Sequence, residues 1–198
     1  EMVIEAYRRG IFPWFNPGEP VLWWSPDPRM VLLPRDFKMS RSLRQRMRRG
    51  GFDIRIDTSF RDVMLACAAP RHGETGTWIG AAMVGVYTRL HEMGVAHSVE
   101  IWMEGELVGG LYGLAIGRVF YGESMFSRRT DASKLALAGL CQCIGQCGFE
   151  LIDCQMETAH LASLGAQAIT RQDFVGRLAR LVHLLPVCDP WKPDSAPF

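Results

Sequence analysis

The spacing of apolar residues along the chain predicts both strands and helices. Apolar and polar residues alternate from Phe52 to Ile56, which is typical of a half-buried strand. Residues 97–103 and 106–116 flank a Glu104-Gly105 turn and are predicted to form a hairpin. Further strands are predicted at residues 118–123 and 149–155, and helices at residues 1–9, 40–49, 59–68, 79–93, 131–146, around 159 and 172–183.

The order of these elements defines the expected fold class. Three strands, a helix, a strand and a helix follow one another in the second half of the chain, which predicts an α/β (α+β) fold with a mixed sheet and covering helices. Acyl-transferring domains of the N-acetyltransferase type are built in a similar order. This is an analogy of fold, and it says nothing about the substrate.

Residues 11–29 interrupt the periodic pattern. They contain five prolines, which exclude a regular helix, and three of the six tryptophans of the chain. Because exposed tryptophan is costly, this segment either packs on the main body or forms a binding face. The chain opens in the middle of a helical pattern without an N-cap residue, so we expect the natural N-terminus to lie upstream.

Composition narrows the class of protein. The 198 residues are 48% hydrophobic and 22% charged, which excludes a mainly disordered chain. No stretch approaches the roughly 18 apolar residues of a membrane span, so no membrane partner is expected. The six cysteines do not resemble a disulfide framework, and the first residues given do not show the charged-then-apolar pattern of a signal peptide. Free thiols and a cytoplasmic location are therefore expected.

The net charge of +1 conceals a strongly basic segment. Residues 35–49 carry seven cations and one anion, and Arg41, Arg44 and Arg48 share one face of the predicted helix. Like charges at this spacing repel one another, so an anionic partner such as phosphate is a reasonable explanation. A solvated helix face is the alternative.

Two polar clusters stand at the ends of predicted strands. Glu123 lies between glycine and serine, where it could contact a cation or simply end a surface strand. Asp153 and Gln155 are two residues apart on a strand, so their side chains share one face. This pair is either a candidate for chemistry or a polar cross-strand network, because buried polar groups need partners.

Other candidate motifs are weaker. Trp14, Trp78 and Phe120 could stack on unpaired bases, although core packing is the simpler interpretation of each. No CxxC pair, paired-histidine zinc pattern or phosphate-binding glycine loop is present, so we expect neither a metal nor a nucleotide cofactor. A nucleophilic pairing of Cys154 with His97 or His160 has no local support.

Several longer motifs together resemble the bacterial leucyl/phenylalanyl-tRNA–protein transferase family. In chain order these segments are Ala6-Tyr7-Arg8-Arg9-Gly10-Ile11-Phe12-Pro13-Trp14-Phe15, Trp23-Trp24-Ser25-Pro26-Asp27-Pro28-Arg29, Gly76-Thr77-Trp78-Ile79, His97-Ser98-Val99-Glu100, residues 107–113, Gly122-Glu123-Ser124-Met125-Phe126-Ser127, Leu151-Ile152-Asp153-Cys154-Gln155 and Ser163-Leu164-Gly165-Ala166. The match runs in order over nearly the whole chain, and several motifs have unusual compositions. On these motifs the chain is identified as a member of the family.

The resemblance implies transfer of Leu, Phe or Met from aminoacyl-tRNA to proteins with N-terminal Lys or Arg, which marks those proteins for degradation. It implies an acetyltransferase-like catalytic domain, expected here at residues 31–198, behind the remainder of a truncated N-terminal domain at residues 1–30. No cofactor is implied, and we expect a monomer.

The resemblance also assigns residues to roles. Asp153 and Gln155 would be the catalytic pair, with Gln155 orienting the amine and Asp153 polarising it or receiving the proton. Glu123 would neutralise the acceptor, and Trp14, Trp78 and Phe120 would surround the terminal adenosine. The candidates for the donor side-chain pocket are Leu111, Met125, Leu137, Leu140 and Ile152. Leu111 stands where some relatives are expected to have Met, which could tune the donor preference.

Two rival functions remain at this point. A CoA-dependent N-acetyltransferase would need a glycine-rich turn before the helix that receives the pyrophosphate, and residues 126–134 contain no glycine. A non-catalytic RNA-binding module would use the basic helix and the aromatic residues. It would leave Asp153, Gln155 and Glu123 without a role.

Overall fold

The computed structural model describes residues 1–16, 18–70 and 78–192. Its strands are β1 (Phe12–Pro13), β2 (Trp23–Trp24), β3 (Arg29–Leu32), β4 (Asp53–Ile56), β5 (Ala96–Met103), β6 (Glu106–Ile116), β7 (Val119–Ser127), β8 (Leu151–Gln155) and β9 (Gln167–Ile169). Its helices are α1 (Met2–Arg8), α2 (Arg41–Arg49), α3 (Phe60–Ala68), α4 (Ala81–Glu92), α5 (Ala132–Gln146), α6 (Ala159–Ser163) and α7 (Arg171–Leu181), with one 3-10 turn, η1 (Pro34–Asp36).

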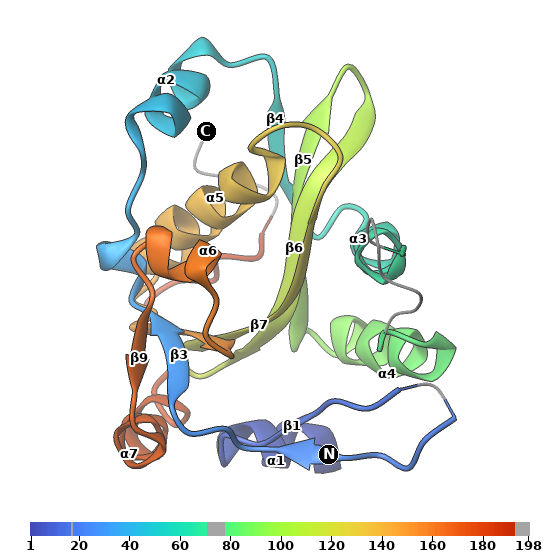
Figure 1. Ribbon diagram of the computed structural model, residues 1–198, viewed down its shortest axis with the longest axis vertical. Helices are drawn as coiled ribbons and strands as arrows, with labels where there is room; N and C mark the ends of the chain where they lie inside the picture. The colour runs from blue at the N-terminus through green and yellow to red at the C-terminus, as the bar shows by residue number, and fades with distance from the viewer. Residues whose placement is uncertain (17, 71–77, 193–198) are drawn as a thin grey trace.

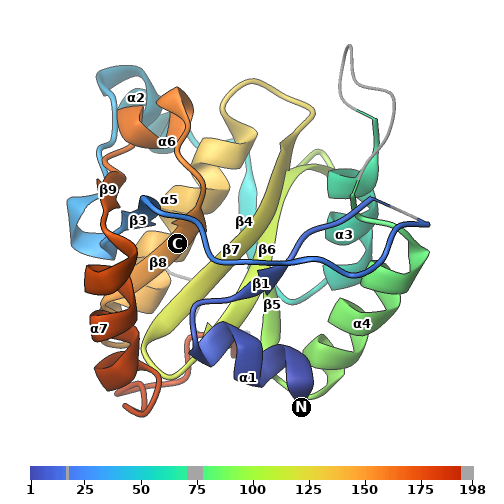
Figure 2. The same ribbon diagram turned by 60° about the horizontal axis from the view of Figure 1, so that its bottom comes forward.

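A seven-stranded mixed sheet organises the molecule. Its strand order is β4-β5-β6-β7-β8-β3-β9, and β1 and β2 form a separate two-stranded ribbon. Helix α5 lies against one face of the sheet, while α3 and α4 lie on the other side (Figure 1). Figure 2 shows the segment that contains β1 crossing in front of the sheet between α4 and α7. The expected fold class, a mixed sheet with covering helices, is confirmed.

The sheet separates two hydrophobic cores. The α5-side core contains the buried residues of α5 together with Leu111, Phe120 and Ile152. The α3/α4-side core contains the buried residues of those two helices together with Tyr7, Tyr112 and others. The inner strands β5, β6, β7, β8 and β3 contribute side chains to both cores, because successive strand residues point to opposite faces.

Strands β7 and β8 are parallel and pair only briefly. Their register joins Val119 to Leu151, Phe120 to Ile152 and Tyr121 to Asp153. Beyond that point β7 continues to Ser127, paired with β6 on its other edge, whereas β8 ends at Gln155. The sheet is therefore open between the second half of β7 and the end of β8.

Most of the elements expected from periodicity are present. The alternation at residues 52–56 forms β4, and Ser40 caps α2 by accepting the Leu43 backbone N–H at 3.1 Å. The sequence patterns missed β1, β2, β3 and β9, which are short strands without alternation. The expected domain boundary at residue 30 falls inside β3 (Arg29–Leu32), so the division into two domains stays a prediction.

The expectation that all cysteines are free thiols is wrong. Cys147, directly after α5, forms a disulfide bond with Cys188 in the C-terminal segment. Trp191, three residues further on, stacks on His97 with ring centroids 3.9 Å apart. The last described residues are therefore fastened to the body of the protein. Within the described residues, no helix has the length and apolar character needed to cross a membrane.

Candidate active site

A cavity of about 610 Å³ lies where β7 and β8 separate. Ten of the fourteen residues singled out from the sequence line it, and they are Trp14, Trp78, Leu111, Phe120, Glu123, Met125, Leu137, Leu140, Ile152 and Gln155. Of the predicted motif around Trp78, residues 76 and 77 lie outside the described residues. The cavity thus brings together residues that are far apart in the sequence, such as Trp14 and Gln155, which are 141 positions apart.

The apolar part of the cavity is a recess in the α5-side core. Leu137 and Leu140 enter it from α5, while Leu111 and Ile152 enter it from β6 and β8. Phe120, on β7, is 1% exposed and belongs to the same core, so it forms part of the wall. Such a recess suits an aliphatic or aromatic side chain.

A β-bulge places the polar group opposite this recess. Tyr112 of β6 pairs with Ser124 and Gly113 pairs with Gly122, which leaves Glu123 as the extra residue on β7. Before the bulge Tyr121 faces the α3/α4-side core, and after it Met125 faces the α5-side core. Both have odd numbers, so the bulge reverses which side chains face which core. Met125 therefore reaches the apolar recess.

The Glu123 carboxylate is held by two tyrosines. Tyr7 of α1 donates to one carboxylate oxygen at 2.7 Å, and Tyr87 of α4 donates to the other at 2.9 Å. The two hydroxyl oxygens are also 2.6 Å apart. Burial raises the pKa of Glu123 to about 7, although both tyrosine hydrogen bonds favour the charged form. Burial also raises the pKa values of Tyr7 and Tyr87, so both hydroxyls remain protonated donors.

Gln155 connects Glu123 to the end of β8. Its side-chain amide donates to Glu123 at 3.0 Å, and its backbone N–H donates to Asp153 at 2.9 Å. Its φ angle is +63°, a left-handed conformation that is uncommon for a residue with a side chain. Residues held in this way often mark functional sites, because the surrounding structure must hold them in place.

Asp153 is not among the residues that line the cavity. It is 0% exposed, and both of its oxygens accept hydrogen bonds from Arg29, at 2.8 and 2.6 Å. The Arg29 guanidinium lies over the rings of Phe12 and Phe174 and also donates to the Gly10 carbonyl at 3.1 Å. This geometry disagrees with the expectation that Asp153 receives a proton from the substrate. Asp153 instead holds the backbone of Gln155 in place by accepting its N–H.

The predicted basic face lies apart from the cavity. Arg41, Arg44 and Arg48 are exposed on α2, and none of them lines the cavity. The phosphate-binding interpretation of this face stays a prediction.

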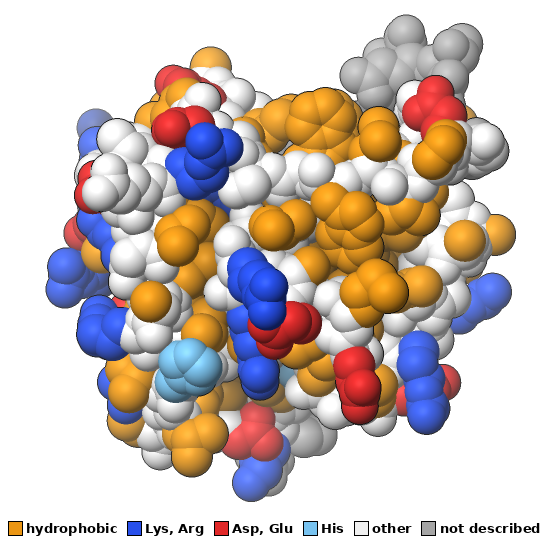
Figure 3. All heavy atoms as spheres, turned by 90° about the horizontal axis from the view of Figure 1, so that it is seen from below, with side chains coloured by type: hydrophobic (Ala, Val, Ile, Leu, Met, Phe, Trp, Pro, Cys, Tyr) orange, Lys and Arg blue, Asp and Glu red, His pale blue; other side chains and the backbone are white. Residues whose placement is uncertain are grey.

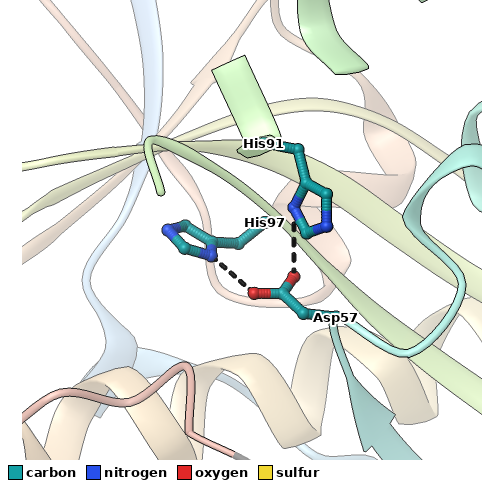
Figure 4. A group of neighbouring side chains, drawn as sticks. All are labelled: Asp57, His91 and His97. Carbon is teal, nitrogen blue, oxygen red and sulfur yellow. Dashed lines mark hydrogen bonds and ion pairs between the residues drawn. The ribbon is translucent and has the colours of Figure 1, made fainter. Parts of the chain in front are cut away.

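The His97-Ser98-Val99-Glu100 motif contacts the residues between β4 and α3 and does not line the cavity. His97 contacts Asp57 through Nδ1 at 2.7 Å, and His91 lies 3.9 Å from the other Asp57 oxygen (Figure 4). The remaining His97 nitrogen faces the Gly94 carbonyl at 3.2 Å. Glu100 is fully buried and accepts the Ser59 backbone N–H at the start of α3. These contacts fix the connection from β4 to α3, away from the cavity.

The structure adds residues that the sequence reasoning did not assign. Tyr7 and Arg29 occur in the quoted motifs without a role, and Tyr87 stands in a predicted helix with nothing to single it out. His160 of α6 also lines the cavity.

Burial raises the pKa of the Cys154 thiol far above its usual value, so a nucleophilic thiolate at this position is disfavoured.

Comparisons with known proteins agree with one another. The family model described as leucyl/phenylalanyl-tRNA protein transferase matches residues 31–179, and the model of that family's N-terminal domain matches residues 1–27. The leucyl/phenylalanyl-tRNA–protein transferase of Thiobacillus denitrificans is 60% identical over 195 residues, which are 98% of this chain and 86% of the relative. The protein of the same name from Nitrosomonas europaea is 62% identical over 181 residues, 91% of this chain and 77% of the relative.

Solved structures with a related arrangement are more distant in sequence. A GCN5-related N-acetyltransferase from Kribbella flavida aligns with a TM-score of 0.42 at 15% identity, over 81% of this chain and 57% of that one. The C-terminal domain of a putative lysylphosphatidylglycerol synthetase from Agrobacterium fabrum aligns with a TM-score of 0.47 at 14% identity, over 92% and 65% of the two chains.

Proposed function

The chain belongs to the leucyl/phenylalanyl-tRNA protein transferase family and is therefore a transferase, and from this premise we propose its substrates and mechanism. It moves Leu, Phe or Met from aminoacyl-tRNA to the α-amine of a protein that begins with Lys or Arg, and it acts as a monomer. The observation that carries the proposal is a cavity that joins an apolar recess to Glu123 and Gln155.

The reaction is aminolysis of an ester. The acceptor nitrogen attacks the carbonyl carbon that joins the amino acid to the terminal ribose, and the carbon–oxygen bond to the ribose breaks. The proton lost by the nitrogen is balanced by the proton that the departing ribose oxygen gains as it becomes a hydroxyl group. With a pKa of about 7.7–8.0, roughly a tenth of the α-amine is already neutral near pH 7. Positioning the two ends is then the main task, and it can supply on the order of 7–11 kcal/mol.

Gln155 orients the attacking amine. Its side-chain NH2 group donates a hydrogen bond to Glu123, so the amide oxygen is the atom that accepts a hydrogen bond from the amine. Asp153 acts indirectly as a positioning residue, because it holds the Gln155 backbone from below the cavity surface. Glu123 in its charged form attracts the positive charge of the acceptor, either its ammonium group or its Lys or Arg side chain.

The donor occupies the other part of the cavity. Its side chain enters the recess formed by Leu111, Met125, Leu137, Leu140 and Ile152. A recess of this kind separates apolar side chains by only ~1–3 kcal/mol per methylene, so acceptance of Leu, Phe and Met is expected. Trp14 and Trp78 contact the terminal adenosine, with Phe120 as the wall behind them.

Contacts at the start of α5 disfavour a CoA-dependent acetyltransferase. Asp131 precedes the helix, so a carboxylate stands where a pyrophosphate would bind. A Cβ atom on Gly109 would lie only 2.4 Å from the Ala132 side chain, so the first turn of α5 packs directly on β6. The segment that leads into α5 therefore presents a carboxylate and, over residues 126–134, no glycine to a pyrophosphate.

One assay separates the candidates. The protein is incubated with radiolabelled Phe-tRNA, differently labelled acetyl-CoA and a peptide that begins with Arg. We expect the phenylalanyl label alone to appear on the peptide, and a matched peptide that begins with Ala to remain unlabelled. Transfer of the acetyl label would favour the acetyltransferase, and binding of tRNA without any transfer would favour the RNA-binding module.

A further inference from the structure

Trp24 has no role in the site described above, although it stands directly beside that site. Its ring lies against the ring of Trp14, with centroids 5.8 Å apart and an angle of 63° between the planes. Its indole N–H donates to the Trp14 backbone carbonyl at 2.7 Å. This hydrogen bond fixes the Trp24 ring at the side of a residue that lines the cavity.

The two rings remain accessible to solvent. Trp14 is 38% exposed and Trp24 is 42% exposed, and Val21, Leu22 and Trp23 beside them are exposed to a similar degree. Figure 3 shows hydrophobic side chains gathered on the face of the molecule that carries β1 and β2. An exposed apolar group of this size, at the mouth of a cavity, is typical of a binding surface.

A cation accompanies the aromatic pair. Arg171, the first residue of α7, is exposed and donates to the backbone carbonyl of Ser25, the residue after Trp24, at 2.8 Å. Its backbone N–H donates to Asp27 at 3.0 Å, so the start of α7 is tied to this loop. Exposed aromatic rings next to an arginine are the composition that binds single-stranded nucleic acid, through stacking on bases and attraction of phosphate.

We propose that Trp24 stacks on the base that precedes the terminal adenosine of the donor tRNA, with Arg171 beside the connecting phosphate. This inference rests on the transferase function proposed above and extends the donor site by one nucleotide. The preceding base is a cytidine in every tRNA, so the contact would serve all donors alike. Its effect is to align the unpaired 3′ end before the ester reaches Gln155.

The test compares a donor that can reach Trp24 with one that cannot. Phenylalanyl-adenosine carries only the terminal nucleotide, whereas phenylalanyl-CCA trinucleotide also carries the two cytidines. The value of kcat/KM for transfer to an Arg-starting peptide is measured with each donor. In the Trp24→Ala variant we expect the trinucleotide value to fall at least about fivefold relative to that of the mononucleotide.

Three variants make the result specific. Trp24→Phe retains an aromatic face and should keep most of the trinucleotide advantage. Val86→Ala changes an apolar side chain of similar exposure on α4 that does not line the cavity, and it should leave the ratio of the two kcat/KM values unchanged. Trp14→Ala should weaken both donors, because Trp14 lines the cavity itself.

The possible failures are distinguishable. An unchanged ratio in Trp24→Ala, or an equal loss with both donors, would overturn the stacking contact while the transferase function stands. A wild-type protein that uses both donors equally well would overturn it too. A wild-type protein that transfers phenylalanine from neither the two short donors nor Phe-tRNA would instead contradict the transferase function.

Discussion

Arg29 and Asp153 form a buried ion pair in which two nitrogens of the guanidinium donate to the two carboxylate oxygens at 2.8 and 2.6 Å. The pair joins β3 to β8 two residues before Gln155. It therefore couples the stability of the sheet to the position of the residue that is proposed to orient the amine.

The first prediction concerns this pair. Asp153→Ala should lower the free energy of unfolding by about 3–5 kcal/mol, because it leaves the Arg29 charge buried without a partner. Turnover should fall on the order of 100-fold, since Gln155 loses the acceptor of its backbone N–H. Urea unfolding and single-turnover transfer measure the two effects separately.

A double variant separates structure from function. In Arg29→Met with Asp153→Leu, no charge remains buried, so much of the lost stability should return. Turnover should stay low, because no carboxylate holds Gln155. Recovery of full turnover in this variant would show that Asp153 serves stability alone.

The second prediction uses the left-handed backbone of Gln155. Gln155→Ala and Gln155→Gly both remove the amide and should lower turnover on the order of 100-fold. The glycine variant should be the more stable of the two by about 1 kcal/mol, because only glycine adopts a φ of +63° without strain. Wild-type turnover in either variant would remove Gln155 from the mechanism.

The third prediction concerns the pH dependence of stability. Burial raises the folded-state pKa of Glu123 to about 7, so the folded protein keeps this proton to a higher pH than the unfolded chain does. The stability that this group contributes is fully present at low pH and is lost as pH rises toward and through 7. Glu123→Gln, which stays neutral, should therefore gain stability relative to wild type between pH 5 and 8, on the order of 3 kcal/mol.

Glu150→Gln is the matched control for that measurement. A hydrogen bond from Arg180 lowers the pKa of Glu150, so its contribution is lost as pH falls rather than as pH rises. Because that loss lies below about pH 5, the Glu150→Gln difference from wild type should stay nearly constant between pH 5 and 8 in urea titrations, whereas the Glu123→Gln difference should grow as pH rises. A flat Glu123→Gln difference across this range would contradict the buried-acid assignment.

The fourth prediction tests the basic face of α2. Replacing Arg41, Arg44 and Arg48 by Ala should weaken tRNA binding and reduce the slope of log affinity against log salt by about one for each lost contact. Replacing Arg61 and Arg89, exposed on α3 and α4, is the control and should leave the slope as it is. An unchanged slope in the triple variant would identify a solvated helix face.

The fifth prediction concerns the disulfide between Cys147 and Cys188, which are 41 positions apart. Closing a loop of this length contributes about 2–4 kcal/mol, so dithiothreitol or Cys188→Ser should lower Tm by several degrees. Cys188→Ser should also be insensitive to the reductant. Equal Tm values with and without reductant in the wild-type protein would mean that the bond does not form in solution.

The sequence patterns predicted the elements that have clear periodicity. Ile54 and Ile56 alternate with exposed residues, and β4 forms there. In contrast, β3 runs from Arg29 to Leu32 between two prolines and is buried throughout, so it offers no alternation to detect. Its buried arginine could not be expected without knowing that Asp153 lies opposite.

The site itself was predicted unevenly for similar reasons. The apolar recess and Glu123 follow from family motifs, and the structure brings them together. The tyrosines on Glu123 come from two helices that are distant in sequence, and local spacing carries no information on such contacts. The same limit explains the disulfide, because Cys147 ends a helix and Cys188 follows in a segment without periodicity.

The one extra residue in the bulge on β7 decides which later side chains of that strand face the apolar recess of the cavity. Glu123 and Met125 lie two positions apart and serve opposite faces only because of one extra residue between paired positions. Deleting Glu123, the extra residue, would turn every later side chain of β7 toward the opposite core. Substitutions of Leu137 or Leu140 on α5, by contrast, would reshape the apolar recess and leave the hydrogen bonds of Glu123 in place.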